Sequence, residues 1–246
     1  MAKVRADLLL VAQGLLAESR PRTATVDHKP ARCFAEKSAS ISLGISLNDD
    51  AQLRVTGDDN PFVSRGGLKL RSALRAFAYD PSGYVAADFG ASTGGFTDCL
   101  LQNGAVKVYA IDVGYGQLHQ RLREDERVVV MERTNARHLD ETSLPELVDI
   151  VVIDASFIGA DKLLPAARAV LKPNGDVLVM VKPQFQVGKD RVEKGGVIRD
   201  EGLRREAIEM VKNSAEALGM LTVGEADSEL KGPKGNQETF LWIKRD

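Results

Sequence analysis

The sequence predicts an α/β protein in which a doubly wound, mostly parallel sheet of seven strands follows a small N-terminal module of mixed helix and strand. Two observations lead to this fold class. From Tyr84 onward, short runs rich in β-branched residues alternate with segments of helical periodicity, the order expected of strands and crossover helices in a parallel sheet. The runs are also nearly unbroken in apolar character, which is typical of strands that helices cover on both faces.

The first sixty residues have a different pattern. Residues 3–19 are expected to form an amphipathic helix, because their apolar side chains recur at helical spacing. Residues 20–60 show little periodicity and are rich in Ser, Asp and Asn, and they end in a turn or linker at 57–61. We therefore divide the chain into a small module over residues 1–60 and a larger domain over residues 61–246.

The larger domain is expected to begin with a helix over residues 67–78, with Lys69, Arg71 and Arg75 among its exposed positions. Strands are predicted at residues 85–89, 106–112, 128–131, 148–154 and 177–182. Helices fit between and after these strands at residues 95–103, 116–124, 160–171 and 200–218. The last two strands, at 220–228 and 239–244, have no helix between them and predict a hairpin on the sheet. In this fold class the ligand site lies at the carboxyl ends of the strands.

Charge is distributed unevenly along the chain. The whole sequence has 33 Lys and Arg against 35 Asp and Glu, a net charge of −2, which by itself argues against a nucleic-acid partner. Residues 1–79, however, hold 12 basic and 8 acidic side chains, whereas residues 80–246 hold 21 and 27. A polyanionic partner would therefore meet the N-terminal third of the chain.

Several broad classes of protein are excluded by composition. Two cysteines, Cys33 and Cys99, provide neither a disulfide framework nor a four-ligand zinc site. The N-terminus lacks the length and cleavage site of a signal peptide, and no stretch approaches 18 uninterrupted apolar residues. We expect a cytoplasmic protein without a membrane span.

A glycine-rich loop follows the first strand of the larger domain and reads Asp88-Phe-Gly-Ala-Ser-Thr-Gly-Gly-Phe96. Glycines after a strand allow a tight turn, and amides at the next helix N-terminus can bind an anionic group. A dinucleotide fingerprint would place its second glycine at Ser92 and does not match. The acidic residue two positions before the first glycine instead resembles the first motif of class I S-adenosylmethionine-dependent methyltransferases. The next strand ends in Asp112, which can accept hydrogen bonds from ribose hydroxyls or act as a helix cap or surface acid.

Four charged residues occupy unusual positions for a packed sheet. Asp154 and Lys182 end two predicted strands, Glu238 opens the last strand, and Lys69 lies on the helix before the sheet. Charges at neighbouring strand ends converge on one crevice, where burial and mutual contact change their acidity. A ribose 2′-hydroxyl is a very weak acid, and a lysine made neutral by a nearby cation and partial burial can accept its proton. We assign this role to Lys182, although the other three also fit ordinary surface or turn positions.

These four residues resemble the Lys-Asp-Lys-Glu tetrad of FtsJ-like 2′-O-ribose RNA methyltransferases. The surrounding sequence is more similar still to the hemolysin-A-like TlyA branch of that family, over about residues 62–245. The segments that carry this similarity are Val63-Ser-Arg-Gly-Gly-Leu-Lys-Leu70, Asp88-Phe-Gly-Ala-Ser-Thr-Gly-Gly-Phe-Thr97, Asp112-Val-Gly-Tyr-Gly-Gln-Leu118, Glu132-Arg-Thr-Asn-Ala-Arg137, Asp154-Ala-Ser-Phe157, Val181-Lys-Pro-Gln-Phe185, Gly195-Gly-Val-Ile198 and Gly232-Pro-Lys-Gly-Asn236.

The resemblance implies an enzyme that uses S-adenosylmethionine, without a metal, to methylate the 2′-hydroxyl of cytidine in 16S or 23S ribosomal RNA or both. Its partners would be ribosomal RNA or ribosomal subunits, and a monomer and a dimer are equally compatible with it. The implied catalytic residues are Lys69, Asp154, Lys182 and Glu238. The implied cofactor-binding residues are Asp88, Gly90, Ser92, Gly94, Gly95, Phe96, Asp112, Asn135 and Phe157. The expected RNA-binding residues are Arg5, Arg20, Arg65, Lys69, Arg71 and Arg75.

The resemblance also implies an S-four-like RNA-binding module at the N-terminus, from which the sequence departs over residues 21–48. That module needs a second basic helix and a strand of pattern Gly-x-Val-x-Val-Asn-Gly, and neither occurs there. The segment has about the right length, and the expected pattern resumes at Leu53-Arg-Val55. Either the segment has diverged or two compensating frameshifts have altered it, and translation of the coding DNA in its other frames distinguishes these explanations.

Other activities fit the sequence less well. Methylation of an exocyclic amine needs a loop with two prolines between the acid and the aromatic residue, and Asp154-Ala-Ser-Phe157 lacks both. Carbon-5 methylation needs a nucleophilic cysteine, and Cys99 is predicted to lie within a helix. A small-molecule substrate would leave the basic segment 65–75 unexplained. A membrane-lytic protein needs an amphipathic insertion segment, for which residues 3–19 are too weakly apolar. The alternatives are a non-enzymatic, membrane-active hemolysin and a methyltransferase that acts on another RNA.

Overall fold

The computed structural model describes residues 3–5, 8–9, 12, 26–29, 46–49, 52–55, 60–193 and 195–246. The chain divides into two compact units, Met1–Asn60 and Pro61–Asp246. Among the helices of the described residues, none combines the length and the apolar character that crossing a bilayer requires.

The smaller unit contains two short antiparallel strand pairs. Strand β1 (Lys3–Arg5) pairs with β3 (Ser46–Asn48), and β2 (Val26–Lys29) pairs with β4 (Gln52–Val55). The predicted helix over residues 3–19 is therefore wrong at its start, because the backbone of Lys3–Arg5 is hydrogen-bonded to a strand more than forty residues away along the chain. Leu8, Leu9 and Ala12 are helical. The rest of that predicted helix, and most of the irregular segment 21–48, lie outside the described residues.

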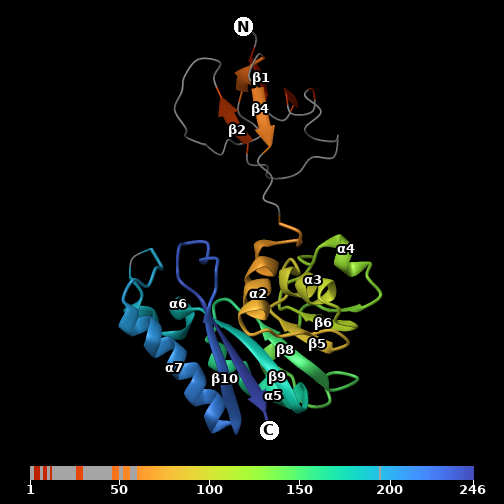
Figure 1. Ribbon diagram of the computed structural model, residues 1–246, viewed down its shortest axis with the longest axis vertical. Helices are drawn as coiled ribbons and strands as arrows, with labels where there is room; N and C mark the ends of the chain where they lie inside the picture. Colours follow the sequence, from red (N-terminus) through yellow and green to blue (C-terminus); the bar gives the residue numbers. More distant parts are fainter. Residues whose placement is uncertain are drawn as a thin grey trace. The chain divides into compact units, whose positions relative to one another are not determined.

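The larger unit is built on a seven-stranded sheet with the order β10-β11-β9-β8-β5-β6-β7 (Figure 1). Its strands are β5 (Val85–Phe89), β6 (Lys107–Ile111), β7 (Val128–Met131), β8 (Val148–Ile153), β9 (Leu171–Val181), β10 (Met220–Asp227) and β11 (Thr239–Arg245). The first five are parallel, and β11 runs antiparallel to both β9 and β10. The predicted mostly parallel sheet with a terminal hairpin is thus confirmed.

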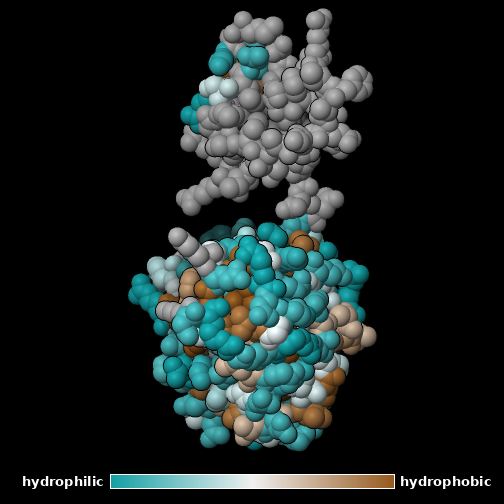
Figure 2. Space-filling view, turned by 90° about the vertical axis from the view of Figure 1, so that its left-hand side faces the viewer, coloured by the Kyte–Doolittle hydropathy of each residue, from teal (hydrophilic) through white to brown (hydrophobic). Residues whose placement is uncertain are grey.

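Helices cover both faces of this sheet (Figure 1). On one face, α2 (Arg65–Ala76), α3 (Gly95–Gln102) and α4 (Gln120–Arg123) contribute to one apolar core, whose buried side chains include Leu70, Leu100 and Leu122. On the other face, α5 (Leu164–Val170) and α7 (Glu201–Ala217) contribute Leu164 and Val211 to a second core. The described segments also form α6 (Pro183–Gln186) and the short 3-10 helices η1 (Ala136–His138), η2 (Ala160–Lys162) and η3 (Lys189–Arg191). The exposed face in Figure 2 is mostly hydrophilic, with apolar residues in patches between polar ones.

Two predicted helices are shorter in the structure. The predicted helix at 116–124 is reduced to the single turn of α4. Gly116 has a left-handed backbone with φ of 69°, and His119 has an extended backbone and caps α4 by accepting from the Arg121 N–H. The predicted helix at 160–171 is divided into η2 and α5, since Pro165 lies in the first turn of α5 and lacks the N–H needed to continue a helix from η2. Strand β9 then begins at Leu171, earlier than the predicted strand at 177–182.

Candidate active site

A cleft of about 300 Å³ opens where the parallel strands end. Its walls come from the start of α2, the loop after β5, the residues that follow β8 and β9, and the loop before β11. Eight residues selected from the sequence line it: Arg65, Lys69, Gly90, Ser92, Gly95, Phe96, Asp154 and Lys182. The fold therefore brings these residues together from four separate parts of the larger unit, at the edge of the sheet where ligands bind in this fold class.

Asp88 fixes the loop after β5 from beneath and does not line the cleft. Its side chain is fully buried, and Oδ2 accepts hydrogen bonds from the Thr97 backbone N–H at 2.9 Å and from Thr97 Oγ1 at 2.7 Å. Oδ1 is also buried and has no hydrogen-bond partner among the described residues. Burial is the main cause that raises the pKa of Asp88 to about 7, while the Thr97 hydrogen bonds act in the opposite direction.

Two glycines of this loop permit close packing. Gly90 has φ of 89°, and a Cβ atom there would lie 2.9 Å from the Asp154 carbonyl oxygen, so only glycine lets the loops after β5 and β8 approach this closely. At Gly95, a Cβ atom would lie 2.2 Å from Ser64 Oγ and 2.8 Å from the Gly67 backbone nitrogen. Gly95 therefore allows α2 and α3 to pack together, in addition to lining the cleft.

Asp112 lies at the end of β6, beside the cleft. Its Oδ2 accepts a hydrogen bond from the Ser92 backbone N–H at 2.9 Å, and its Oδ1 accepts one from Gly114 N–H at 2.7 Å. Each carboxylate oxygen can accept a second hydrogen bond, and the half-buried side chain remains accessible. Because Ser92 lines the cleft, Asp112 extends this site toward β6 and offers acceptors suited to hydroxyl groups.

The remaining predicted cofactor residues are not among those that line the cleft. Gly94 is buried in the loop, and exposed Asn135 caps η1 by accepting from the Arg137 N–H. Phe157 is 91% exposed, has a left-handed backbone with φ of 68°, and packs against Phe185 with ring centroids 5.3 Å apart.

A buried ion pair joins Lys69 to Glu238. Lys69 Nζ lies 2.5 Å from Glu238 Oε2, and the two side chains are only 9% and 1% exposed. The prediction that Lys69 is an exposed helix residue is wrong, because the carboxylate that balances its charge comes from the far end of the chain. Lys69 reaches the cleft, whereas Glu238 does not line it. Glu238 thus holds the Lys69 ammonium in place without itself lining the cleft.

A second ion pair joins Lys182 to Asp154. Lys182 Nζ lies 2.5 Å from Asp154 Oδ1, with the side chains 10% and 23% exposed. The same nitrogen donates a hydrogen bond to Ser156 Oγ at 3.0 Å. Sequence reasoning did not single out Ser156, although its position two residues after a strand-end acid was a usable signal. The four predicted catalytic residues therefore form two ion pairs, each of which presents one lysine to the same cleft.

The expected RNA-binding residues are more dispersed. Arg65 is exposed and lines the cleft, while Arg71 lies over the Phe62 ring at 5.4 Å and exposed Arg75 is 3.7 Å from Glu229. Arg5 is exposed on β1 of the smaller unit, and Arg20 lies outside the described residues. Lys231 and Pro233 also line the cleft, and their loop had not been chosen as a contact site from the sequence.

The chain is similar to known methyltransferases over nearly its whole length. Residues 62–245 match the family described as FtsJ-like methyltransferase. The 16S/23S rRNA (cytidine-2′-O)-methyltransferase TlyA of Mycobacterium tuberculosis is 43% identical over 243 residues, which cover 98% of this chain and 90% of the relative. The solved structure of a candidate hemolysin from Lactococcus lactis is 44% identical with a TM-score of 0.73, and the match covers 75% of this chain and 89% of that one.

A more distant structure shows the same fold. A candidate S-adenosylmethionine-dependent methyltransferase from Listeria monocytogenes matches 74% of this chain and 100% of its own, with a TM-score of 0.53 and 13% identity. The seven-stranded sheet with helices on both faces is thus the class I methyltransferase fold predicted from the glycine-rich loop and the order of the strands.

Proposed function

Because this chain belongs to the FtsJ-like methyltransferase family, we propose that it transfers a methyl group from S-adenosylmethionine to the 2′-hydroxyl of a cytidine in ribosomal RNA, in 16S, 23S or both. The observation that carries the proposal is the cleft at the strand ends, where two ion-paired lysines face the glycine-rich loop. The relative from M. tuberculosis bears this activity in its name.

The residues beside the cleft fit S-adenosylmethionine. When bound, this cofactor supplies an electrophilic methyl group on a positively charged sulfur. The close approach at Gly90 leaves no side chain between the loops after β5 and β8, and the Asp112 oxygens can accept hydrogen bonds from two ribose hydroxyls. We assign Gly90, Ser92 and Asp112 to direct contact, with Asn135 and Phe157 at the outer end of the site. Asp88 and Gly95 hold the loop in place.

We assign Lys182 as the proton acceptor for the target hydroxyl. Lys182 Nζ would accept the proton of the target hydroxyl as that oxygen is methylated. S-adenosylmethionine would supply the methyl group and keep the bonding electron pair on its sulfur. Asp154 lies 2.5 Å from Lys182 Nζ, so it stabilises the ammonium group that the proton transfer creates. The hydrogen bond to Ser156 fixes the direction of the nitrogen.

Lys69 supplies a fixed positive charge to the same cleft. Its ion pair with buried Glu238 keeps its ammonium in one place. Glu238 is therefore a positioning residue that acts through Lys69. The alignment of hydroxyl and methyl group within the cleft contributes a large part of the rate.

For the smaller unit we propose a role in binding RNA, with ribosomal subunits in the cytoplasm as partners. The observation in support is its exposed Arg5. Residues 1–60 hold eight basic and eight acidic side chains, so the basic excess over residues 1–79 lies on α2 of the larger unit. The assignment of this unit as an S-four-like module is a prediction from the sequence alone.

The decisive experiment uses S-adenosylmethionine labelled in its methyl group with 30S, 50S and 70S particles from a strain that lacks the modification. Ribose methylation blocks cleavage of the next phosphodiester bond, so the label is expected in nuclease-resistant dinucleotides that begin with cytidine. Label recovered on a base, or no label on RNA with any particle, would contradict the proposal. A Lys107→Met variant, altered at the opposite end of the sheet, is expected to label the same position as the wild type.

A further inference from the structure

A second pocket, of about 450 Å³, adjoins the cleft. It lies between the segment 197–201 that leads into α7 and the loop 228–238 that leads into β11. Lys231 lines both this pocket and the cleft, so one continuous surface connects them. The other basic residues that line the second pocket are Arg199, Arg204 and Lys234.

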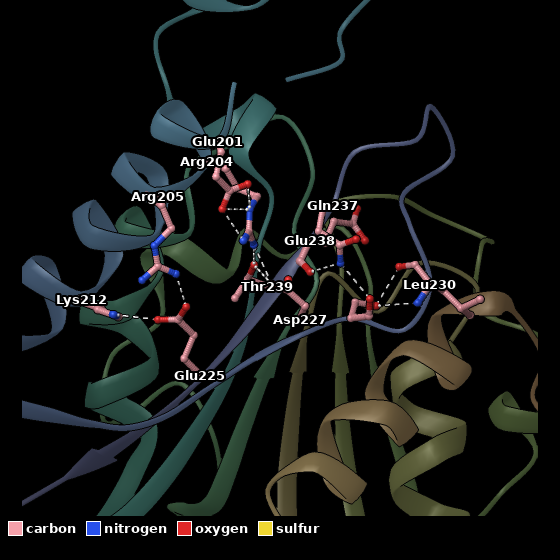
Figure 3. Close-up of polar contacts among 11 residues, drawn as sticks. Glu201, Arg204, Arg205, Lys212, Glu225, Asp227, Leu230, Gln237, Glu238 and Thr239 are labelled. Atoms are coloured by element: carbon pink, nitrogen blue, oxygen red, sulfur yellow. Dashed lines mark hydrogen bonds and ion pairs between the residues drawn. The ribbon is translucent and has the colours of Figure 1, made fainter. Parts of the chain in front are cut away.

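The acidic side chains of this pocket are already engaged. Arg204 donates hydrogen bonds to both carboxylate oxygens of Glu201, at 2.9 and 2.7 Å, and also to Asp227 at 2.7 Å (Figure 3). Asp200 caps α7, where its Oδ1 accepts from the Gly202 and Leu203 N–H groups. Arg204 balances the charge of Glu201, and the four basic residues that line the pocket outnumber its two acidic ones, Asp200 and Glu201.

Its other cations are available. Lys231 and Lys234 are exposed and form no ion pair with any acidic side chain in the described part of the chain. Arg199 is paired with Glu193, but those two side chains are 71% and 53% exposed, and such a solvent-exposed pair exchanges partners at little cost. The pocket therefore presents positive charge that an anion can neutralise.

The loop 228–238 is held in one conformation. Buried Asn236 donates through Nδ2 to the Gly196 carbonyl and accepts through Oδ1 from the Ile198 N–H, both at 2.8 Å. A Cβ atom at Gly232 would lie 2.7 Å from Glu238 Oε1, so the loop packs directly on the carboxylate that holds Lys69. The charged pocket and the Lys69–Glu238 ion pair thus share one preformed loop.

We propose that the second pocket binds a backbone phosphate of the RNA substrate, next to the nucleotide whose ribose enters the cleft. Lys231 and Lys234 would contact the phosphate, and Arg199 would join them. This inference rests on the proposed function, because it needs an RNA strand in the cleft. A strand that places one ribose there carries a phosphate on each side of it, and the surface shared through Lys231 leads one of these into the second pocket. Lysines suit this contact as point charges that tolerate any sequence.

The test measures equilibrium binding of the full chain to a fluorescent rRNA fragment over a series of salt concentrations. Lys234→Gln and Arg199→Gln are each expected to weaken binding and to reduce the slope of log affinity against log salt by up to about 0.7, the value for the loss of one phosphate contact, with affinity for S-adenosylmethionine unchanged. The control Lys107→Gln removes the same charge at the opposite end of the sheet and should change neither quantity. Lys231 is left intact because it also lines the cleft.

Three results separate the possibilities. Wild-type affinity and slope in both pocket variants would overturn the phosphate contact, even if the protein methylates ribosomal RNA. Inorganic phosphate that binds the wild type tightly, with RNA affinity the same in all variants, would overturn it in favour of a free anion. Reduced slopes in both variants support the contact, and this holds even if labelled S-adenosylmethionine modifies no ribose, an outcome that would contradict only the proposed function.

Discussion

Replacement of Lys69 by methionine tests the buried ion pair beneath the cleft. The Lys69 and Glu238 side chains are 9% and 1% exposed and 2.5 Å apart. Lys69→Met keeps an unbranched side chain of similar length, so it removes the charge while largely preserving the packing of the stem. Glu238 is then left as a buried carboxylate without its cation.

The size of the effect follows from this burial. The removal of one partner of a buried pair destabilises a protein by about 3–5 kcal/mol, chiefly because the other charge remains unpaired. Glu238→Gln in the same chain removes that charge, so the double variant should recover about 2 kcal/mol of the loss. Arg75→Met is the matched control, because Arg75 and Glu229 are 68% and 61% exposed, and loss of such a pair costs less than about 1 kcal/mol.

The assay is urea unfolding followed by the fluorescence of Trp242. It is the only tryptophan of the chain and lies on β11, the strand that Glu238 directly precedes, so it reports on the larger unit. A Lys69→Met loss no greater than that of Arg75→Met would contradict the predicted cost of leaving Glu238 unpaired. So would a double variant that is as unstable as Lys69→Met alone, since the unpaired charge would then not be the cause.

Three further predictions concern the loop, pH and RNA. The Asp88 pKa is raised to about 7, so the folded state favours the protonated carboxyl. The free energy of unfolding of the wild type, relative to that of Asp88→Asn, should therefore fall by about 2–4 kcal/mol from pH 4 to above pH 7. A relative free energy that does not vary with pH in urea titrations would show that burial does not raise this pKa. Gly90→Ala should weaken S-adenosylmethionine binding in calorimetry, whereas Gly83→Ala should not, because Gly83 has a similar φ of 78° but no atom within 4 Å of the position that a Cβ would take. Affinity for rRNA fragments should decrease steeply with salt, and a flat salt dependence would be incompatible with the basic surfaces as the contact.

The sequence was most informative where burial imposes a regular pattern. Strands β5 and β8 were located almost to the residue, because both faces of each are covered and their runs of apolar residues end at the sheet edge. The same ends carry Asp88 and Asp154, so the position of the cleft followed from the strands. The different roles of Asp88 and Asp154 could not be predicted in this way, since both are strand-end acids and only the packing shows that Asp88 faces inward.

Long-range contacts limited the rest. Lys69 is separated from Glu238 by 169 positions, so helical spacing alone placed it on an exposed face. Lys3–Arg5 were assigned to a helix for a similar reason, because the strand that pairs with them, Ser46–Asn48, lies in a segment without a recognisable pattern. Pro165, which separates η2 from α5, was visible in the sequence, whereas the early start of β9 at Leu171 was not.

The transfer of a ribose hydroxyl proton to Lys182 in this cleft is the step on which the proposed function depends. Its most direct test is single-turnover methyl transfer to ribosomal particles by Lys182→Met, with S-adenosylmethionine binding measured in parallel by calorimetry. We predict a transfer rate lower by a factor of about 100 or more, cofactor affinity within a few fold of wild type, and unchanged transfer in the Lys107→Met control. A Lys182→Met enzyme that binds cofactor and methylates the same ribose at close to the wild-type rate would contradict this role of Lys182.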